Sequence, residues 1–154
     1  MPFEYKINRQ VEFSDTDMAG IMHFSNFFRF MEVAEHGFYR ALGIEMHPEF
    51  IEGKVGWPRV HASCDYKHPL RFGEEVEIRL LVREVRARTV GYTFIFRKQQ
   101  GGRAVEVARG NIIAAAVAVD PVKRTMKAVP IPPEILAKIE VAPAELFNEE
   151  TPNP

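Results

Sequence analysis

The spacing of hydrophobic positions along the chain changes from every second residue to every third or fourth, and then returns to every second. Residues 5–13 alternate, with Ile7, Val11 and Phe13 among the apolar positions, which predicts a strand. Over residues 25–42 the apolar positions instead follow one stripe of a helix. These positions are Phe27, Met31, Ala34, Phe38 and Leu42. The N-terminal part of the chain therefore predicts a strand followed by a long amphipathic helix.

The expected helix has suitable residues at both ends. Ser25 is a preferred N-cap residue type, and Gly43 can adopt the left-handed conformation that follows the last turn of many helices. Charged side chains such as Arg29 and Glu32 occupy the face opposite the apolar stripe. Because the apolar face is broad, we expect a sheet to wrap the helix.

Four further apolar or alternating segments follow, and short turns separate them. They cover residues 59–68, 74–86, 89–98 and 105–119. We expect antiparallel strands there, and a short helix at residues 134–139. Sequential antiparallel strands around one helix predict an α+β fold. The sequence thus predicts a single domain over residues 1–141 and a flexible tail over residues 142–154.

The last expected strand bears on the oligomeric state. Residues 112–119 are apolar on both faces of that strand. A strand buried on both faces needs a covering layer on each side. We expect another subunit to supply the second layer, in a homodimer or a homotetramer. A wholly intramolecular core is the alternative.

Composition narrows the possible functions. With 154 residues, 46% hydrophobic and 27% charged, the chain is typical of a soluble globular domain. A formal net charge of −1 offers no electrostatic footprint for nucleic acid. No segment reaches the ~18 uncharged apolar residues of a membrane span, and charges interrupt any signal peptide in residues 1–10. The lone Cys64 can form no intrachain disulfide, so we expect a cytoplasmic protein.

The segment between the first strand and the helix is the main candidate for chemistry. Asp15 and Asp17 lie one residue apart and are followed by Ala19 and Gly20. A helix N-terminus has free N–H groups and a partial positive charge, which can stabilise an oxyanion. A carboxylate beside it could hydrolyse an acyl compound, either as a nucleophile or as a general base on water. The alternative is that Asp15 or Asp17 only shapes an Asx turn.

The same segment resembles a known family. The resemblance lies in the motif Phe13-x-Asp15-x-Asp17-x-Ala19-Gly20-Ile21-x-x-Phe24-x-Asn26, with Arg29 on the helix, and continues in Asp65-Tyr66-x-x-Pro69-x-x-x-Gly73. Both are similar to the signature of 4-hydroxybenzoyl-CoA thioesterases and related acyl-CoA thioesterases. The resemblance covers about residues 5–140. It implies the hotdog fold, in which a five-stranded antiparallel sheet wraps the long helix and subunits pair edge to edge.

The resemblance also implies roles for individual residues. Asp17 matches the family's catalytic carboxylate, and the backbone N–H near Phe24 matches the group that polarises the thioester carbonyl. Many bacterial relatives carry Tyr-His where this chain has His23-Phe24, so His23 is expected only as a neighbour of the site. A loop histidine with a solvent or backbone partner is the alternative for His23. Coenzyme A is part of the implied substrate, and we expect neither a cofactor nor a metal.

Several other residues are secondary candidates. Glu35 lies at the margin of the apolar stripe and could be a second acid in the cleft, or its side chain could extend to solvent. Phe28 is turned away from the core stripe and could wall an acyl pocket, and Gly20 could contact the substrate. Arg86 and Arg88 could bind the phosphates of coenzyme A, although solvated charge is the ordinary alternative.

We therefore expect hydrolysis of a short, medium or aromatic acyl-CoA. Hydration or dehydration of an acyl thioester is one alternative, but it needs a histidine paired with an acid, and His23 with Asp17 matches that motif poorly. Non-catalytic acyl-CoA binding is another, although a carboxylate beside the thioester would weaken such binding. The sequence has no GxSxG, P-loop or GxGxxG motif to support a serine hydrolase, nucleotide hydrolase or dinucleotide enzyme.

Overall fold

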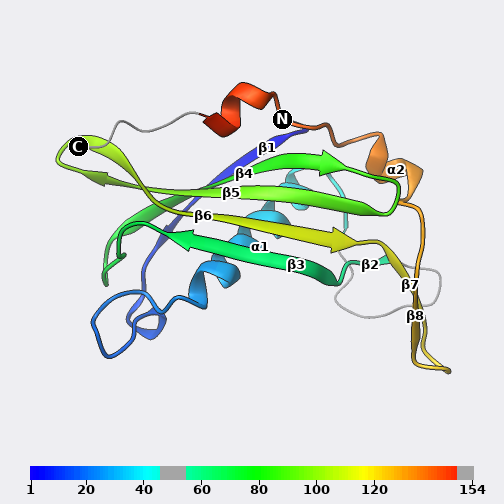
Figure 1. Cartoon of the computed structure of the whole chain (residues 1–154), viewed down its shortest axis with the longest axis horizontal. Helices are drawn as coiled ribbons and strands as arrows, with labels where there is room; N and C mark the ends of the chain where they lie inside the picture. Colours follow the sequence, from blue (N-terminus) through cyan, green and yellow to red (C-terminus); the bar gives the residue numbers. More distant parts are fainter. Residues whose placement is uncertain (46–54, 149–154) are drawn as a thin grey trace.

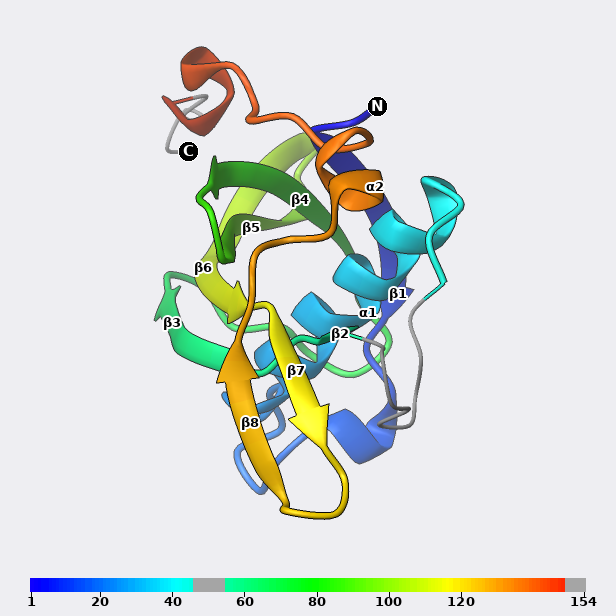
Figure 2. The same ribbon diagram turned by 90° about the vertical axis from the view of Figure 1, so that its right-hand side faces the viewer.

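The computed structural model describes residues 1–45 and 55–148 of the chain (Figure 1). Its main element is an antiparallel five-stranded sheet with strand order β1-β4-β5-β6-β3. The strands are β1 (Glu4–Gln10), β3 (Arg59–Tyr66), β4 (Glu75–Val85), β5 (Thr89–Gln100) and β6 (Arg103–Ala115). Helix α1 (Asn26–Ala41) lies along one face of this sheet (Figure 2). This confirms the expected α+β fold, in which a five-stranded sheet wraps one long helix.

Helix α1 forms where its periodicity predicts, and its apolar stripe faces the sheet. The stripe is buried from Phe27 to Phe38, and it packs into one core with alternate side chains of β4 such as Leu80. Gly110 of β6 lies directly under Met31, and a Cβ at Gly110 would overlap the Met31 side chain. The absence of a side chain at Gly110 thus makes room for the end of the Met31 side chain, and any larger residue would displace it.

The apolar run near the end of the last expected strand is divided between two sheets. Strand β6 ends at Ala115, and β7 (Val117–Asp120) belongs to a second sheet of order β2-β7-β8. The other two strands of that sheet, β2 (Val55–Gly56) and β8 (Thr125–Ala128), were not predicted. At the junction, the Ala116 N–H donates to the Arg88 C=O at 2.8 Å, which turns the chain out of the large sheet. Figure 2 shows β7 and β8 projecting as a hairpin.

The prediction of one continuous strand over residues 105–119 is therefore wrong. Ala115, Ala116 and Val117 are buried within the chain itself, where the two sheets meet. Their apolar character needs no second subunit, so it no longer supports an oligomer. A homodimer or homotetramer stays a prediction, and it must be argued from other features of the structure.

Residues near the C-terminus cover part of the outer face of the large sheet. Helix α2 (Pro133–Leu136) overlaps the first half of the segment expected to be helical, and a 3₁₀ turn (Ala144–Asn148) follows. Ala142 is buried against Leu81 and Ile95, which point away from α1. Residues 142–148, which we expected to begin a flexible tail, thus pack on the sheet, while residues 149–154 of that tail lie outside the described part. Within the described residues, no helix has the length and apolar character needed to cross a membrane.

Candidate active site

The loop between β1 and α1 is held in place by backbone hydrogen bonds. The Asp17 N–H donates to the Ile21 C=O at 2.9 Å, and the Gly20 N–H donates to the Asp17 C=O at 3.0 Å. The Met22 N–H then donates to the Leu70 C=O at 2.7 Å. These contacts close a tight turn and anchor it to the segment that follows β3. Asp17 and the residues after β3 are therefore neighbours.

The two oxygens of Asp17 have different environments. Its Oδ1 accepts the Ala19 N–H at 2.8 Å, which is the Asx-turn contact that the sequence left open. Among the described residues, Oδ2 has no hydrogen-bond donor. One oxygen thus holds the turn, and the other is available to a ligand. A role in loop structure and a role in chemistry are compatible at this residue.

Asp15 connects the loop to the beginning of the helix through its backbone. Its C=O accepts two hydrogen bonds, from the His23 N–H at 2.9 Å and from Asn26 Nδ2 at 2.8 Å. Its carboxylate Oδ2 accepts the Glu12 N–H at 2.8 Å. The backbone oxygen and the carboxylate Oδ2 of Asp15 therefore both stabilise the local structure. The Asn26 amide, which is part of the sequence motif, ties the loop that carries Asp17 to the first residue of α1.

His23 has local partners within its own segment. Its Nδ1 accepts the Ser25 N–H at 3.3 Å and lies 2.7 Å from Ser25 Oγ. Ser25 occupies the expected N-cap position, but its hydroxyl makes no capping hydrogen bond to the helix. The hydroxyl contacts His23 instead. This arrangement matches the alternative of a loop histidine with nearby partners, and His23 does not line the pocket described next.

A mostly apolar pocket of about 540 Å³ opens beside Asp17 and the helix start. Ten residues of the β1–α1 region and of the segment after β3 line it. They are Asp17, Ile21, Met22, Phe24, Phe27, Tyr66, Lys67, His68, Pro69 and Leu70. The structure thereby brings together Asp17 and Phe24, the two residues with the main predicted roles. Among the described residues, no acceptor binds the Phe24 N–H, which leaves it available to a ligand.

Three polar residues of this pocket were not assigned roles from the sequence. Tyr66, Lys67 and His68 follow one another at the end of β3. The Tyr66 hydroxyl donates to the Phe24 C=O at 2.9 Å, and Lys67 forms an ion pair with Glu106. The signal available in the sequence was the second motif, over residues 65–73, which contains Tyr66 and Pro69 and belongs to the same family signature as the loop motif. Which element that motif would face depends on the sheet register.

Glu35 lies outside this pocket. Its side chain is 1% exposed, and its Oε1 lies 2.9 Å from Arg59 Nη2 at the start of β3. Burial raises the pKa of the Glu35 carboxyl above its ordinary value, although the charge and hydrogen bond of Arg59 oppose this. The expectation that Glu35 extends to solvent is wrong. Glu35 instead pairs with the basic side chain of Arg59.

Phe28 also differs from its expected position. Its side chain is partly buried and packs against the main core, and the pocket lining does not include it. Phe24 and Phe27 supply the phenyl rings of the pocket instead. The Phe27 ring meets the Tyr66 ring edge to face, with centroids 5.0 Å apart. Residue Phe27 thus serves both the core stripe and the pocket.

Arg86 and Arg88 lie at the other end of the sheet from the pocket. Strand β4 starts close to the loop, where the Val11 N–H donates to the Glu74 C=O at 2.8 Å, and it ends just before Arg86. Its length corresponds to about 35 Å of extended chain. Arg86 lies 3.2 Å from Glu84, with most of its side chain exposed. Within one subunit, neither arginine lines the pocket beside Asp17.

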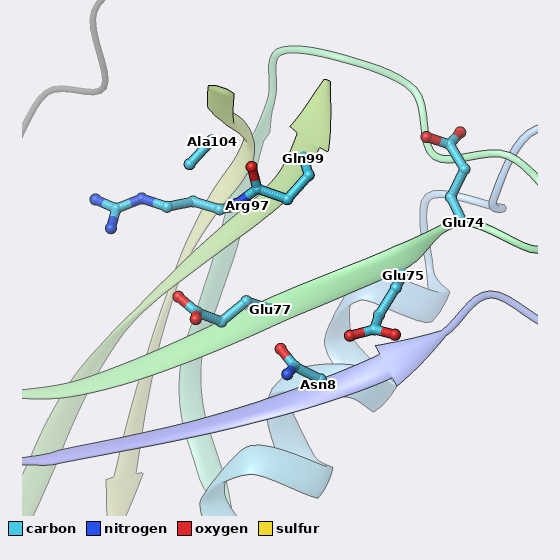
Figure 3. A pocket seen from close by; sticks show the side chains of 7 residues that line it. All are labelled: Asn8, Glu74, Glu75, Glu77, Arg97, Gln99 and Ala104. Atoms are coloured by element: carbon cyan, nitrogen blue, oxygen red, sulfur yellow. The ribbon is translucent and has the colours of Figure 1, made fainter. Parts of the chain in front are cut away.

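A second pocket, of about 490 Å³, lies on the outer face of the sheet, away from α1 (Figure 3). Side chains from β1, β4, β5 and β6 line it. They are Asn8, Glu74, Glu75, Glu77, Arg97, Gln99 and Ala104. Its lining has three carboxylates and one arginine, and this excess of negative charge disfavours an anionic ligand such as coenzyme A. The pocket beside Asp17 is therefore the better candidate for a thioester substrate.

Comparison with known proteins identifies the family. A model of the thioesterase-like superfamily matches residues 11–139. The chain belongs to the thioesterase-like superfamily. An Aquifex aeolicus relative, provisionally described as an esterase, is 32% identical over 136 residues, which are 88% of this chain and 96% of that protein.

Two further similar proteins carry more specific descriptions. A 1,4-dihydroxy-2-naphthoyl-CoA hydrolase from Synechococcus elongatus is 37% identical over 78 residues, which are 50% of this chain and 57% of that protein. The solved structure of BH1999, a gentisyl-coenzyme A thioesterase, superposes with a TM-score of 0.70 at 32% identity, covering 87% of this chain and 98% of that one. The expectation of a hotdog-fold thioesterase is thereby confirmed.

Proposed function

We propose that this thioesterase hydrolyses a short, medium or aromatic acyl-CoA to the free acid and coenzyme A at the pocket beside Asp17. The observation that carries this proposal is the shared lining of that pocket by Asp17 and Phe24. Asp17 offers a carboxylate oxygen without a protein donor, and Phe24 offers an N–H without a protein acceptor. A carboxylate and an oxyanion donor at one apolar pocket are the parts that thioester hydrolysis needs.

The Phe24 N–H would donate to the thioester oxygen and stabilise the negative charge that develops there. The environment suits this role, because a donor at a helix start in an apolar pocket gains from the helix dipole and from low local polarity. A single donor of this kind contributes a factor of ~10²–10³ in rate. His23 would act only by holding the backbone beside Phe24, through its contacts with Ser25.

Asp17 Oδ2 would then act either as a nucleophile or as a general base. As a nucleophile it attacks the carbonyl carbon, the thiolate of coenzyme A leaves, and water hydrolyses the resulting mixed anhydride. As a general base it takes a proton from water, and the water oxygen attacks the carbonyl carbon directly. Both routes consume one water and release the acid and coenzyme A.

An aromatic acyl group has the best support. The phenyl rings of Phe24 and Phe27 and the Tyr66 ring line the pocket, and flat groups stack favourably on such rings. The relatives described as a naphthoyl-CoA hydrolase and a gentisyl-coenzyme A thioesterase act on aromatic thioesters by their names. We propose that this chain shares that preference over long aliphatic chains.

The oligomer that we propose uses the free edge of the large sheet. Among the described residues, strand β3 pairs only with β6, and Val60, His61 and Ala62 in its first half are exposed. An exposed edge strand can pair with the same strand of a second copy, giving a homodimer or, from two dimers, a homotetramer. Arg86 and Arg88 would contribute to coenzyme A binding only through such an assembly. Cys64 is a free thiol, which suits the cytoplasmic location that we propose.

A panel of coenzyme A thioesters tests the proposed function. Release of free thiol would be followed with benzoyl, phenylacetyl, butyryl, hexanoyl and palmitoyl thioesters, with Asp17→Asn as the inactive control. We expect kcat/KM to be highest for the aromatic thioesters and low for palmitoyl-CoA. Loss of acyl-CoA without thiol release would instead indicate hydration or dehydration. Tight binding without turnover would indicate an acyl-CoA binding protein.

A further inference from the structure

The Tyr66 side chain joins the edge of the sheet to the start of the helix. Its hydroxyl donates to the Phe24 C=O at 2.9 Å, across 42 residues of sequence. Its ring stacks edge to face on Phe27, with an angle of 80° between the ring planes. The ring contact fixes where the hydroxyl points. Tyr66, the last residue of β3, thus connects that end of the strand to the backbone of Phe24.

The backbone around Phe24 depends on such links, because Phe24 precedes the helix. It lies outside the i to i−4 hydrogen bonds of α1, and its side chain is 62% exposed. The peptide before it is held on one side, since the His23 C=O accepts the Asn26 N–H at 3.0 Å. The C=O and N–H of one peptide point in opposite directions, so this bond directs the Phe24 N–H away from Asn26. The peptide after Phe24 is held through its C=O by Tyr66.

We propose that Tyr66 is a positioning residue, whose hydroxyl holds the Phe24–Ser25 peptide so that the Phe24 N–H stays aimed into the pocket as the oxyanion donor. This inference rests on the proposed function. Two hydrogen bonds, one on each side of the Phe24 Cα, then determine the backbone dihedral angles of that residue. Without the Tyr66 bond, the second peptide would rotate, and the donor would lose its fixed direction.

The chemistry of Tyr66 suits a permanent donor. Tyr66 is 45% exposed, and the partial desolvation of its hydroxyl, together with the nearby Cys64, raises the pKa of that hydroxyl to about 12. The hydroxyl therefore keeps its proton over the whole working range of an enzyme and stays a donor to the Phe24 C=O. A phenylalanine at position 66 would keep the ring contact with Phe27 and remove only the hydrogen bond.

The experiment compares Tyr66→Phe with Tyr5→Phe as a matched control. Tyr5 lies on β1 and packs against Gly37, remote from the lining of the pocket. Four quantities are measured for each protein: kcat and KM on benzoyl-CoA, the melting temperature, and the ¹⁵N order parameter of the Phe24 amide without substrate. The order parameter reports directly on the backbone, and a merely stabilising role would not change it selectively.

For Tyr66→Phe we expect a fall in kcat of about 10- to 100-fold, less than the loss of the donor itself would cost, with KM within about twofold of wild type. We expect a lower order parameter for Phe24 and an unchanged one for residues in the middle of α1. Tyr5→Phe should match wild type in kcat and in the Phe24 amide.

Two results would overturn the proposal: an unchanged Phe24 order parameter in Tyr66→Phe, or a loss of kcat that merely parallels a fall in melting temperature. Failure of the proposed function is a separate outcome. A wild-type protein that releases no thiol from any thioester of the panel would reject that function, and the substrate-free order parameter would still decide whether Tyr66 positions Phe24.

Discussion

The Glu35 carboxylate lies 2.9 Å from the Arg59 guanidinium, and yet its second oxygen has no hydrogen-bond partner among the described residues. The contact joins the middle of α1 to the start of β3, 24 positions apart in the sequence. Tyr39 and Tyr92, whose hydroxyls are hydrogen-bonded to each other, interact electrostatically with the same carboxylate. Glu35 is therefore a buried acid whose charge is only partly compensated by Arg59. The free-energy cost of burying that charge depends on pH, because only the ionised form bears it.

We predict that Glu35→Gln changes the pH dependence of stability. The folded protein raises the pKa of Glu35 above its ordinary value of 4.5, so folded Glu35 binds its proton more tightly than unfolded Glu35 does. Its contribution to stability is thus fully present below pH 4.5 and is lost as the pH rises through the folded pKa. Glutamine does not titrate, so Glu35→Gln does not lose stability in this way as the pH rises. The free energy of unfolding of Glu35→Gln relative to wild type should therefore rise from pH 4.5 toward neutral pH.

Urea denaturation between pH 4.5 and 8 measures this difference. Glu32→Gln is the matched control, because Glu32 also faces Arg59, at 3.8 Å, but about half of its side chain is exposed. Its difference from wild type should stay flat over the same range. Parallel stability curves for wild type and Glu35→Gln would contradict the prediction.

Asp17→Asn should abolish most turnover while leaving the fold intact. The asparagine Oδ1 can still accept the Ala19 N–H that closes the loop, so its geometry is kept. Loss of a general base or nucleophile should lower kcat by about 10²-fold or more. Glu35→Gln should retain turnover, because Glu35 does not line the pocket. Thiol release and calorimetric binding of benzoyl-CoA check both variants, and near wild-type kcat in Asp17→Asn would exclude the assignment.

Gly20→Val should reduce activity more than Phe24→Leu. Gly20 has φ of 80°, which a β-branched residue adopts only at a cost of about 1–3 kcal/mol, and its N–H bonds the Asp17 C=O. Phe24 is proposed to act through its backbone, so leucine should preserve most of the rate. Gly73→Val is the matched control, since Gly73 has φ of 84° and, like Gly20, no atom near an added Cβ. Comparable small losses of kcat in Gly20→Val and Phe24→Leu would count against the loop geometry.

Val60→Lys should weaken the assembly that we propose through the edge of β3. Val60 is 60% exposed on that strand, and charged residues on an edge strand oppose pairing with another copy. Val122→Lys, at a position that is 90% exposed after β7, is the control and should not change the oligomer. Light scattering gives the mass of each protein. A wild-type protein that is active as a stable 17.6 kDa monomer would refute the assembly.

The sequence by itself determined the elements whose signal is local. The stripe from Phe27 to Phe38 predicts α1 within one residue at each end, because a helix of period 3.6 places i, i+4 and i+7 on one face whatever packs there. The same holds for the alternation in β4, where Leu80 faces the core. The loop motif also predicted that Asp17 and Phe24 lie near each other, since both belong to the short loop that precedes the helix, and both line one pocket.

Only the tertiary structure decided contacts between distant residues. The bond from Tyr66 to Phe24 and the pair of Glu35 with Arg59 depend on how β3 lies along α1, which the β3–β6 register sets. A shift of that register by one residue would turn Tyr66 to the other face of the sheet. The end of β6 at Ala115 is likewise set by partners elsewhere in the chain. Local periodicity carries no information on such partners, because it depends on neighbours along the chain and not on neighbours across the sheet.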